Sequence, residues 1–187
     1  LPFYALFAAD VRPRWIAVAL ALPTGIAWFA FVQLTLLLFA PMAMPVRRYA
    51  IAAALVIGIT APMSISLIGL TMNDWYVAAF VMVAVLVVVR GLVHPPLSTR
   101  ALLVAGALVG LAAGLKLTGA IYGVGLIGGL LAVSGTMRTR VRAALLAGLA
   151  MAAAFALTAG PWMFTLWQRY ANPLFPYFND VFRSPWA

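Results

Sequence analysis

Long runs of apolar residues, interrupted by single charges, constrain this chain more than any other feature of its sequence. They cover 15–40, 49–70, 75–93, 101–133 and 141–159. A helix needs about 20 residues to cross a hydrocarbon core that is roughly 30 Å thick. With 66% hydrophobic and 8% charged residues, the chain has more apolar surface than a soluble fold can bury. The sequence therefore predicts an all-α, polytopic transmembrane helical bundle.

The stretch 101–133 is too long for a single crossing. As one helix it would extend about 50 Å, and Lys116 and Gly119 lie near its middle. We therefore predict two short helices, over 101–115 and 119–133, that turn near Lys116. Such a turn has to be buried in protein or line a wet cavity. The chain then forms a single transmembrane domain, 1–187, with about six spans and an outer aromatic loop over 160–187.

The charged residues predict an orientation rather than a nucleic-acid partner. The net charge is +9, but the charges stand between the apolar runs, as in loops that orient a membrane protein. If the loop that contains Arg47 and Arg48 is cytoplasmic, seven basic residues lie inside and five outside. Asp10, Asp74 and Asp180 then share the outer face with five of the six tryptophans. We expect a multi-pass protein of the bacterial inner membrane, with membrane lipid as a partner and an oligomeric state that the sequence leaves open.

Glycines recur every four residues in the first half of 101–133, at Gly106, Gly110 and Gly114. Small residues with this spacing line one helical face and allow a neighbouring backbone to approach closely. Tight helix packing is the first interpretation, and close approach to a ligand is the second.

Ionisable residues at the edges of membrane spans are candidate functional residues. Asp74 opens the span 75–93, where a carboxylate can activate an acceptor hydroxyl or hold a divalent cation. The alternative is helix capping, since Asn and Asp are favoured at helix starts. Lys116 can pair with the phosphate of a lipid carrier, or it can simply extend to the interface. His94 has no second ligand nearby, so we predict no metal site there.

The segment after the last apolar run is rich in proline, aromatic and polar residues. Prolines fix an irregular path, and aromatic residues anchor a loop at the headgroup level. One interpretation is an interfacial loop; the other is a lid beside a lipid-linked substrate, whose polar side chains bind sugar hydroxyls or phosphate. The candidate residues in this segment are Arg169, Asn172, Asn179, Asp180 and Arg183.

Three stretches together resemble bacterial polytopic glycosyltransferases of the GT-C type, which use polyprenyl-phosphate-linked sugars. They are GLTMND at 69–74, GLAAGLKLTG at 110–119, and the segment 160–186. The resemblance spans most of the chain. Within the GT-C type, the chain is similar to members that transfer mannose or aminoarabinose. It implies that Asp74 matches the second acidic position and that Lys116 matches a basic residue near the carrier phosphate. These enzymes also have an acidic first outer loop, which we expect to precede Leu1, because Asp10 matches no such motif.

We therefore predict an enzyme that moves a hexosyl or pentosyl unit from a polyprenyl-phosphate carrier to an acceptor on the outer, periplasmic face. Asp74 is the predicted catalytic residue. Asn73, Lys116 and the five residues of the C-terminal segment are predicted to bind substrate. The cofactor is unknown, with a divalent cation as the candidate. The alternatives are a secondary transporter with a site in 101–133 and a non-catalytic membrane subunit whose aromatic loop docks a partner.

Overall fold

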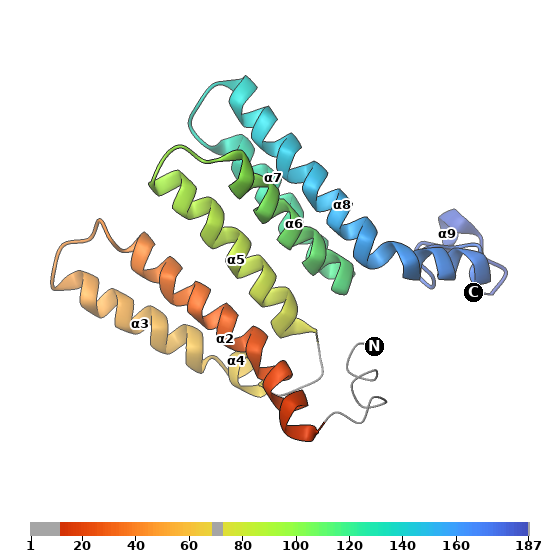
Figure 1. Cartoon of the computed structure of the whole chain (residues 1–187), viewed down its shortest axis with the longest axis horizontal. Helices are drawn as coiled ribbons and strands as arrows, with labels where there is room; N and C mark the ends of the chain where they lie inside the picture. The colour runs from red at the N-terminus through yellow and green to blue at the C-terminus, as the bar shows by residue number, and fades with distance from the viewer. Residues whose placement is uncertain (1–11, 69–72, 187) are drawn as a thin grey trace.

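The structure is a computed structural model that describes residues 12–68 and 73–186, and these residues contain helices and no strands (Figure 1). Asp10 and 69–72 lie outside the described residues. The helices are α2 (Pro13–Leu38), α3 (Val46–Thr60), α4 (Pro62–Ser66), α5 (Asp74–Val93), α6 (Thr99–Leu115), α7 (Ala120–Ala132), α8 (Met137–Tyr170) and α9 (Asn179–Phe182), with a 3-10 turn, η1 (Leu117–Gly119), between α6 and α7.

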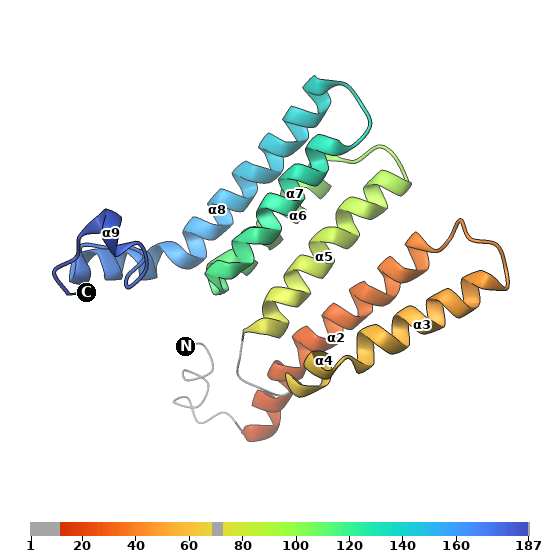
Figure 2. The ribbon, with the colours of Figure 1, turned by 180° about the vertical axis from the view of Figure 1, so that it is seen from behind.

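The long helices run along a common direction, so the bundle has two distinct ends: α2 and α5 run parallel, as do α6 and α8, whereas α5 and α6 run in opposite directions (Figure 1). Helices α3, α2, α5, α6 and α8 pack side by side in that order, and α7 packs against α6 and α8 on one face of this layer (Figure 2). One end holds the starts of α3, α6 and α8, and the other holds the start of α5 and the turn between α6 and α7.

The surface of the helices is strongly apolar. Helices α2, α5 and α8 are each long and apolar enough to cross a membrane. Leu149 and Leu157 of α8 have 68% and 79% of their surface exposed, and Phe29 of α2 has 64%. Side chains of this kind are unfavourable in water but are well placed against lipid. The chain is therefore a membrane protein, and the residues that the structure describes are organised by helices alone. Helix α6 and the stretch of η1 and α7 are shorter apolar helices.

The predicted break near Lys116 is confirmed. Helix α6 ends at Leu115, and Lys116 has an extended backbone with φ −148° and ψ 111°. The turn is compact because Gly119 is buried against α6. A Cβ atom at Gly119 would lie 3.1 Å from the carbonyl oxygen of Ala112.

The glycines of α6 pack against α8, which confirms the interpretation of tight helix packing. A Cβ atom at Gly106 would collide with the carbonyl group of Ala147, and one at Gly110 would collide with that of Met151. Ala147 is fully buried in the main apolar cluster of the bundle. Absence of a side chain therefore allows α6 and α8 to approach backbone to backbone.

Two predicted helix bounds are wrong, and proline is involved in both. The stretch 49–70 is not one helix: α3 ends at Thr60, and α4 begins at Pro62. Ala61 is extended, with φ −54° and ψ 136°, because a residue before proline disfavours the helical conformation. Conversely, α8 does not end at Ala159 but continues through Pro161 to Tyr170. Proline keeps a helical φ and can kink a helix without ending it.

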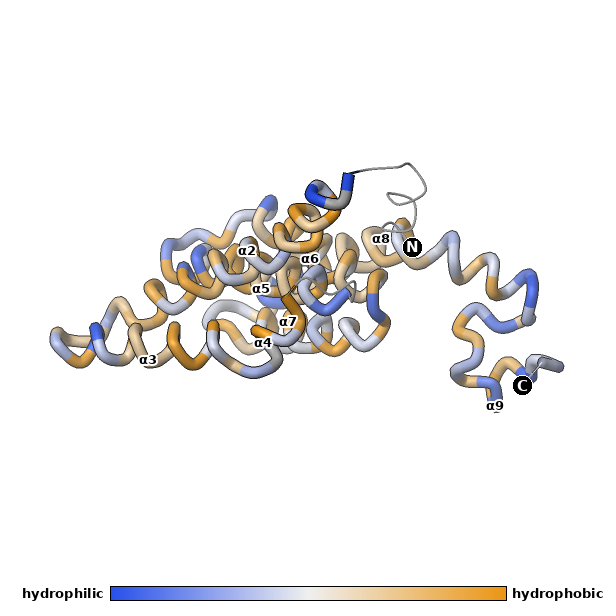
Figure 3. Tube along the Cα trace, turned by 90° about the horizontal axis from the view of Figure 1, so that it is seen from below, coloured by the Kyte–Doolittle hydropathy of each residue, from blue (hydrophilic) through white to orange (hydrophobic). Residues whose placement is uncertain are grey.

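The predicted aromatic loop 160–187 therefore starts later than expected. It begins at Ala171, which has a left-handed backbone with φ 53° and donates its N–H to the carbonyl oxygen of Trp167 at 2.8 Å. Figure 3 shows apolar residues concentrated in the bundle and more hydrophilic ones in this C-terminal segment, which extends away from it.

Candidate functional site

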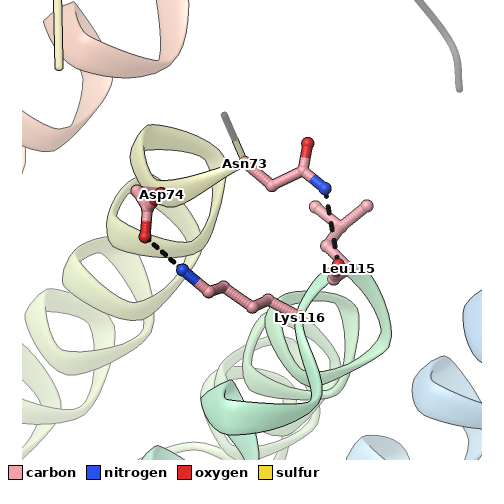
Figure 4. A network of polar contacts seen from close by, with 4 residues as sticks. All are labelled: Asn73, Asp74, Leu115 and Lys116. Atoms are coloured by element: carbon pink, nitrogen blue, oxygen red, sulfur yellow. Dashed lines mark hydrogen bonds and ion pairs between the residues drawn. The ribbon is translucent and has the colours of Figure 1, made fainter. Parts of the chain in front are cut away.

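An ion pair joins the start of α5 to the turn after α6. The Nζ atom of Lys116 donates to Oδ1 of Asp74 at 2.6 Å (Figure 4). The two side chains are 45% and 33% exposed, respectively. Asp74, the predicted catalytic carboxylate, and Lys116, the predicted partner of a carrier phosphate, therefore bind each other directly. We call them the Asp74/Lys116 pair.

The arrangement of the two helices explains why these charges meet. Helices α5 and α6 are packed neighbours that run in opposite directions, so the N-terminus of α5 lies beside the C-terminus of α6. A helix N-terminus favours a negative charge and a C-terminus favours a positive one. Asp74 lies in the first turn of α5, and Lys116 follows the last residue of α6. Each helix end therefore favours the charge that it carries.

Hydrogen bonds on both sides hold the backbone of Lys116. Its N–H donates to the carbonyl oxygen of Ala112 at 3.1 Å, and its own carbonyl oxygen accepts from the N–H of Gly119 at 2.7 Å. The direction in which the lysine side chain leaves the turn is therefore set by the fold of the turn.

Asn73 links the same two helices. It occupies the cap position of α5 but makes no side-chain capping bond. Its Nδ2 atom instead donates to the carbonyl oxygen of Leu115 at 3.4 Å (Figure 4). That carbonyl is one of those that a helix C-terminus leaves without a partner in its own helix. The capping interpretation therefore does not describe this site, because both Asn73 and Asp74 direct their side chains to α6.

An apolar groove of 490 Å³ lies between α2 and α5. Its lining residues are Leu22, Pro23, Ile26, Tyr76, Phe80 and Val83, among others. Tyr76 follows Asp74 by two residues in α5, and the two side chains lie on different faces of this helix: Tyr76 faces α2, and Asp74 faces the turn after α6. A proline at 23 removes the N–H that would bond the carbonyl of Ala19, and the Tyr76 hydroxyl donates to that oxygen at 3.0 Å. Sequence reasoning missed this tyrosine, although Pro23 inside a helix signals a carbonyl in need of a donor.

The asparagines of the C-terminal segment bond their own loop. Asn172 is fully buried; its Oδ1 accepts from the N–H of Leu174 at 2.9 Å, and its Nδ2 donates to the carbonyl oxygen of Tyr177 at 2.9 Å. Oδ1 of Asn179 accepts from the N–H of Ser184 at 2.8 Å. Their amides therefore shape the loop in this structure.

The other three candidates of this segment, Arg169, Asp180 and Arg183, are exposed. Figure 1 shows the end of α8 and helix α9 extending beyond the bundle, apart from the junction of α5 and α6. The structure thus brings Asn73, Asp74 and Lys116 together and places the other five predicted site residues in a separate segment.

No protein-family model, no curated protein and no solved structure matches this chain.

Proposed function

We propose that this chain is the membrane part of a GT-C type glycosyltransferase. It moves a sugar from a polyprenyl-phosphate carrier to an acceptor hydroxyl on the outer, periplasmic face of the bacterial inner membrane. The observation that carries the proposal is the Asp74/Lys116 pair, a carboxylate and an ammonium 2.6 Å apart at one end of a membrane bundle. Both residues match positions of the GT-C resemblance.

The carboxylate suits the acceptor hydroxyl of this reaction, and the ammonium suits the leaving phosphate. In the transfer, the acceptor oxygen bonds to the anomeric carbon of the sugar, and the bond from that carbon to the phosphate oxygen breaks. The phosphate leaves with the electron pair, and an ammonium stabilises its growing charge. A carboxylate accepts the proton of the hydroxyl. Because the two groups now bind each other, the pair has to open when donor and acceptor bind.

The surroundings of the pair support a lipid-linked donor. A prenyl chain is apolar and requires an apolar channel, and an apolar groove lies between α2 and α5, with Tyr76 in its lining, within one helical turn of Asp74 but on another face of α5. In the proposal the phosphate lies at Lys116 and the prenyl chain follows this groove into the membrane. Asn73 holds α5 and α6 together beside the phosphate.

The proposed orientation places the pair outside. Seven arginines lie at the opposite end of the bundle or within two helical turns of it, namely Arg47, Arg48, Arg90, Arg100, Arg138, Arg140 and Arg142. Basic residues favour the cytoplasmic side of a membrane. In this arrangement α6 and α7 form a helical hairpin, and with α3 and α4 as one interrupted span the chain has six crossings.

Sugar transfer in proteoliposomes tests the proposal. The protein is reconstituted with radiolabelled polyprenyl-phosphate mannose or polyprenyl-phosphate aminoarabinose, and release of the polyprenyl phosphate is measured. Asp74→Asn should lower transfer at least about a hundredfold, as for loss of a general base, and Lys116→Ala should lower it by about the same factor, as for loss of a group that stabilises developing charge. Arg48→Ala, an exposed cation at the other end, is the matched control and should keep the activity.

Equal transfer by Asp74→Asn, Lys116→Ala and the unchanged protein would remove both residues from the site. Uptake of a labelled solute into sealed vesicles without any sugar transfer would favour the secondary transporter instead.

A further inference from the structure

A second cavity lies at the arginine-rich end of the bundle, at the opposite end from the Asp74/Lys116 pair. Its volume is 390 Å³, and it lies between the loop after α5, the loop after α7 and the first turns of α8. Arg140, Arg142 and Ser134 contribute polar groups to its wall. Leu102, Leu130 and Leu146 contribute apolar ones. The cavity therefore combines two guanidinium groups with an apolar floor.

The arginines of this cavity have no acidic partner among residues 12–68 and 73–186. The one ion pair of these residues is the Asp74/Lys116 pair, and Asp180 lies in the C-terminal segment. The Nε atom of Arg140 is buried and has no hydrogen-bond partner. A buried guanidinium N–H without an acceptor is unfavourable. An anionic ligand in the cavity can supply this acceptor.

The chemistry of the wall selects a phosphate group. Guanidinium groups bind phosphate with paired N–H donors, and Ser134 has a hydroxyl donor. The cavity also lies at the N-terminus of α8, where Thr136 caps the helix by accepting the N–H of Thr139 at 3.3 Å. A helix N-terminus adds a positive dipole end for an anion. The apolar floor is suited to the first carbons of acyl chains.

We propose that this cavity binds the phosphate group of an anionic phospholipid. The same guanidinium chemistry also accepts free phosphate, and the experiment separates the two sources. The site is independent of sugar transfer, since it involves neither the Asp74/Lys116 pair nor the groove between α2 and α5. Basic pockets between helices on the cytoplasmic side of a membrane are suited to acidic headgroups.

Lipid binding to the purified protein in a neutral detergent tests this proposal. Native mass spectrometry counts bound phosphatidylglycerol and, as a lipid of the same acyl chains without net charge, phosphatidylcholine. Phosphatidylglycerol should bind roughly tenfold more tightly than phosphatidylcholine, as expected for hydrogen bonds between charged groups. Arg140→Gln and Arg142→Gln should each remove most of this difference. Arg138→Gln, on the same helix but not in the cavity wall, should change it less than twofold.

Inorganic phosphate at millimolar concentration identifies the source. If it leaves phosphatidylglycerol bound, the site takes the lipid headgroup; if it displaces the lipid, the site takes phosphate from either source. Both results support a phosphate site. Equal binding of the two lipids to the unchanged protein overturns the proposal. So does an equal loss in Arg138→Gln, because it would indicate only diffuse attraction between the basic face and acidic lipid. Arg142→Lys retains the positive charge and perturbs folding less than Arg142→Gln. It should keep part of the preference for phosphatidylglycerol over phosphatidylcholine.

Discussion

Exchanging the charges of the Asp74/Lys116 pair separates a structural role from a chemical one. Asp74→Lys places two ammonium groups together, and Lys116→Asp places two carboxylates together. The double variant restores an opposite pair across the same helix junction. If the pair only ties α5 to α6, the double variant should recover the function of the unchanged protein. If the carboxylate and the ammonium have separate tasks in sugar transfer, it should not.

The expected effect on stability is small. The side chains are 45% and 33% exposed, and an ion pair this exposed contributes about 0.2–1 kcal/mol. Each charge also interacts favourably with its helix end, by about 0.3–1 kcal/mol. Each single reversal should therefore cost about 1–2 kcal/mol. The double variant recovers the attraction between the charges but leaves both helix ends with the unfavourable charge.

The expected effect on sugar transfer is much larger. Loss of a positioned general base lowers a rate by about 10²–10⁴, whereas 1 kcal/mol of stability hardly changes the folded fraction of a protein that is stable by several kcal/mol. Transfer of labelled sugar in proteoliposomes should therefore stay at least a hundredfold reduced in the double variant, while thermal unfolding in detergent shows a folded protein. Recovery of transfer to within about threefold would refute the chemical role and leave a purely structural pair.

Three further substitutions test the packing. Gly110→Val should destabilise the bundle by about 1–3 kcal/mol, measured by thermal unfolding in detergent, because its side chain meets the backbone of α8; an unchanged midpoint would contradict the close approach. Tyr76→Phe should cost about 1–3 kcal/mol in the same assay, since it leaves the carbonyl of Ala19 without its hydroxyl donor, and Phe80→Tyr serves as a control that leaves this bond intact. Asn172→Ala should speed proteolysis of the C-terminal loop and leave the bundle intact, as its buried amide organises only that loop; equal cleavage rates would refute this.

The helical class and the turn at Lys116 were predictable because both depend on the chain's local pattern. Apolar length and the position of one charge decide whether a segment can cross a membrane or has to turn. The interruption at Pro62 and the continuation through Pro161 were not predicted, because a proline can either end a helix or remain inside it. The outcome depends on the conformation of its neighbours, which the apolar pattern alone does not give.

The candidate site was predictable residue by residue but not as a unit. Asp74 and Lys116 are 42 residues apart, and their contact depends on α5 and α6 being packed neighbours. The sequence shows that each residue ends or begins a helix, but not which helix ends meet. Asn172 is the opposite case, because its hydrogen bonds are local and do not depend on how helices pack. The sequence could have indicated them, since asparagine side chains commonly bond the backbone two residues on in a turn.

Pro161 divides α8 into a part that is long enough to cross a bilayer and a part that follows it. The part of α8 that precedes this proline is roughly 35 Å long at 1.5 Å per residue, close to the roughly 30 Å of a hydrocarbon core. Figure 1 shows α8 changing direction toward its C-terminal end, and Trp162 and Trp167, both exposed, follow the proline. Indole rings favour the headgroup layer. A shift of the proline by one helical turn would therefore move the exit point of α8 by about 5 Å and carry the entire C-terminal segment to a new height above the lipid.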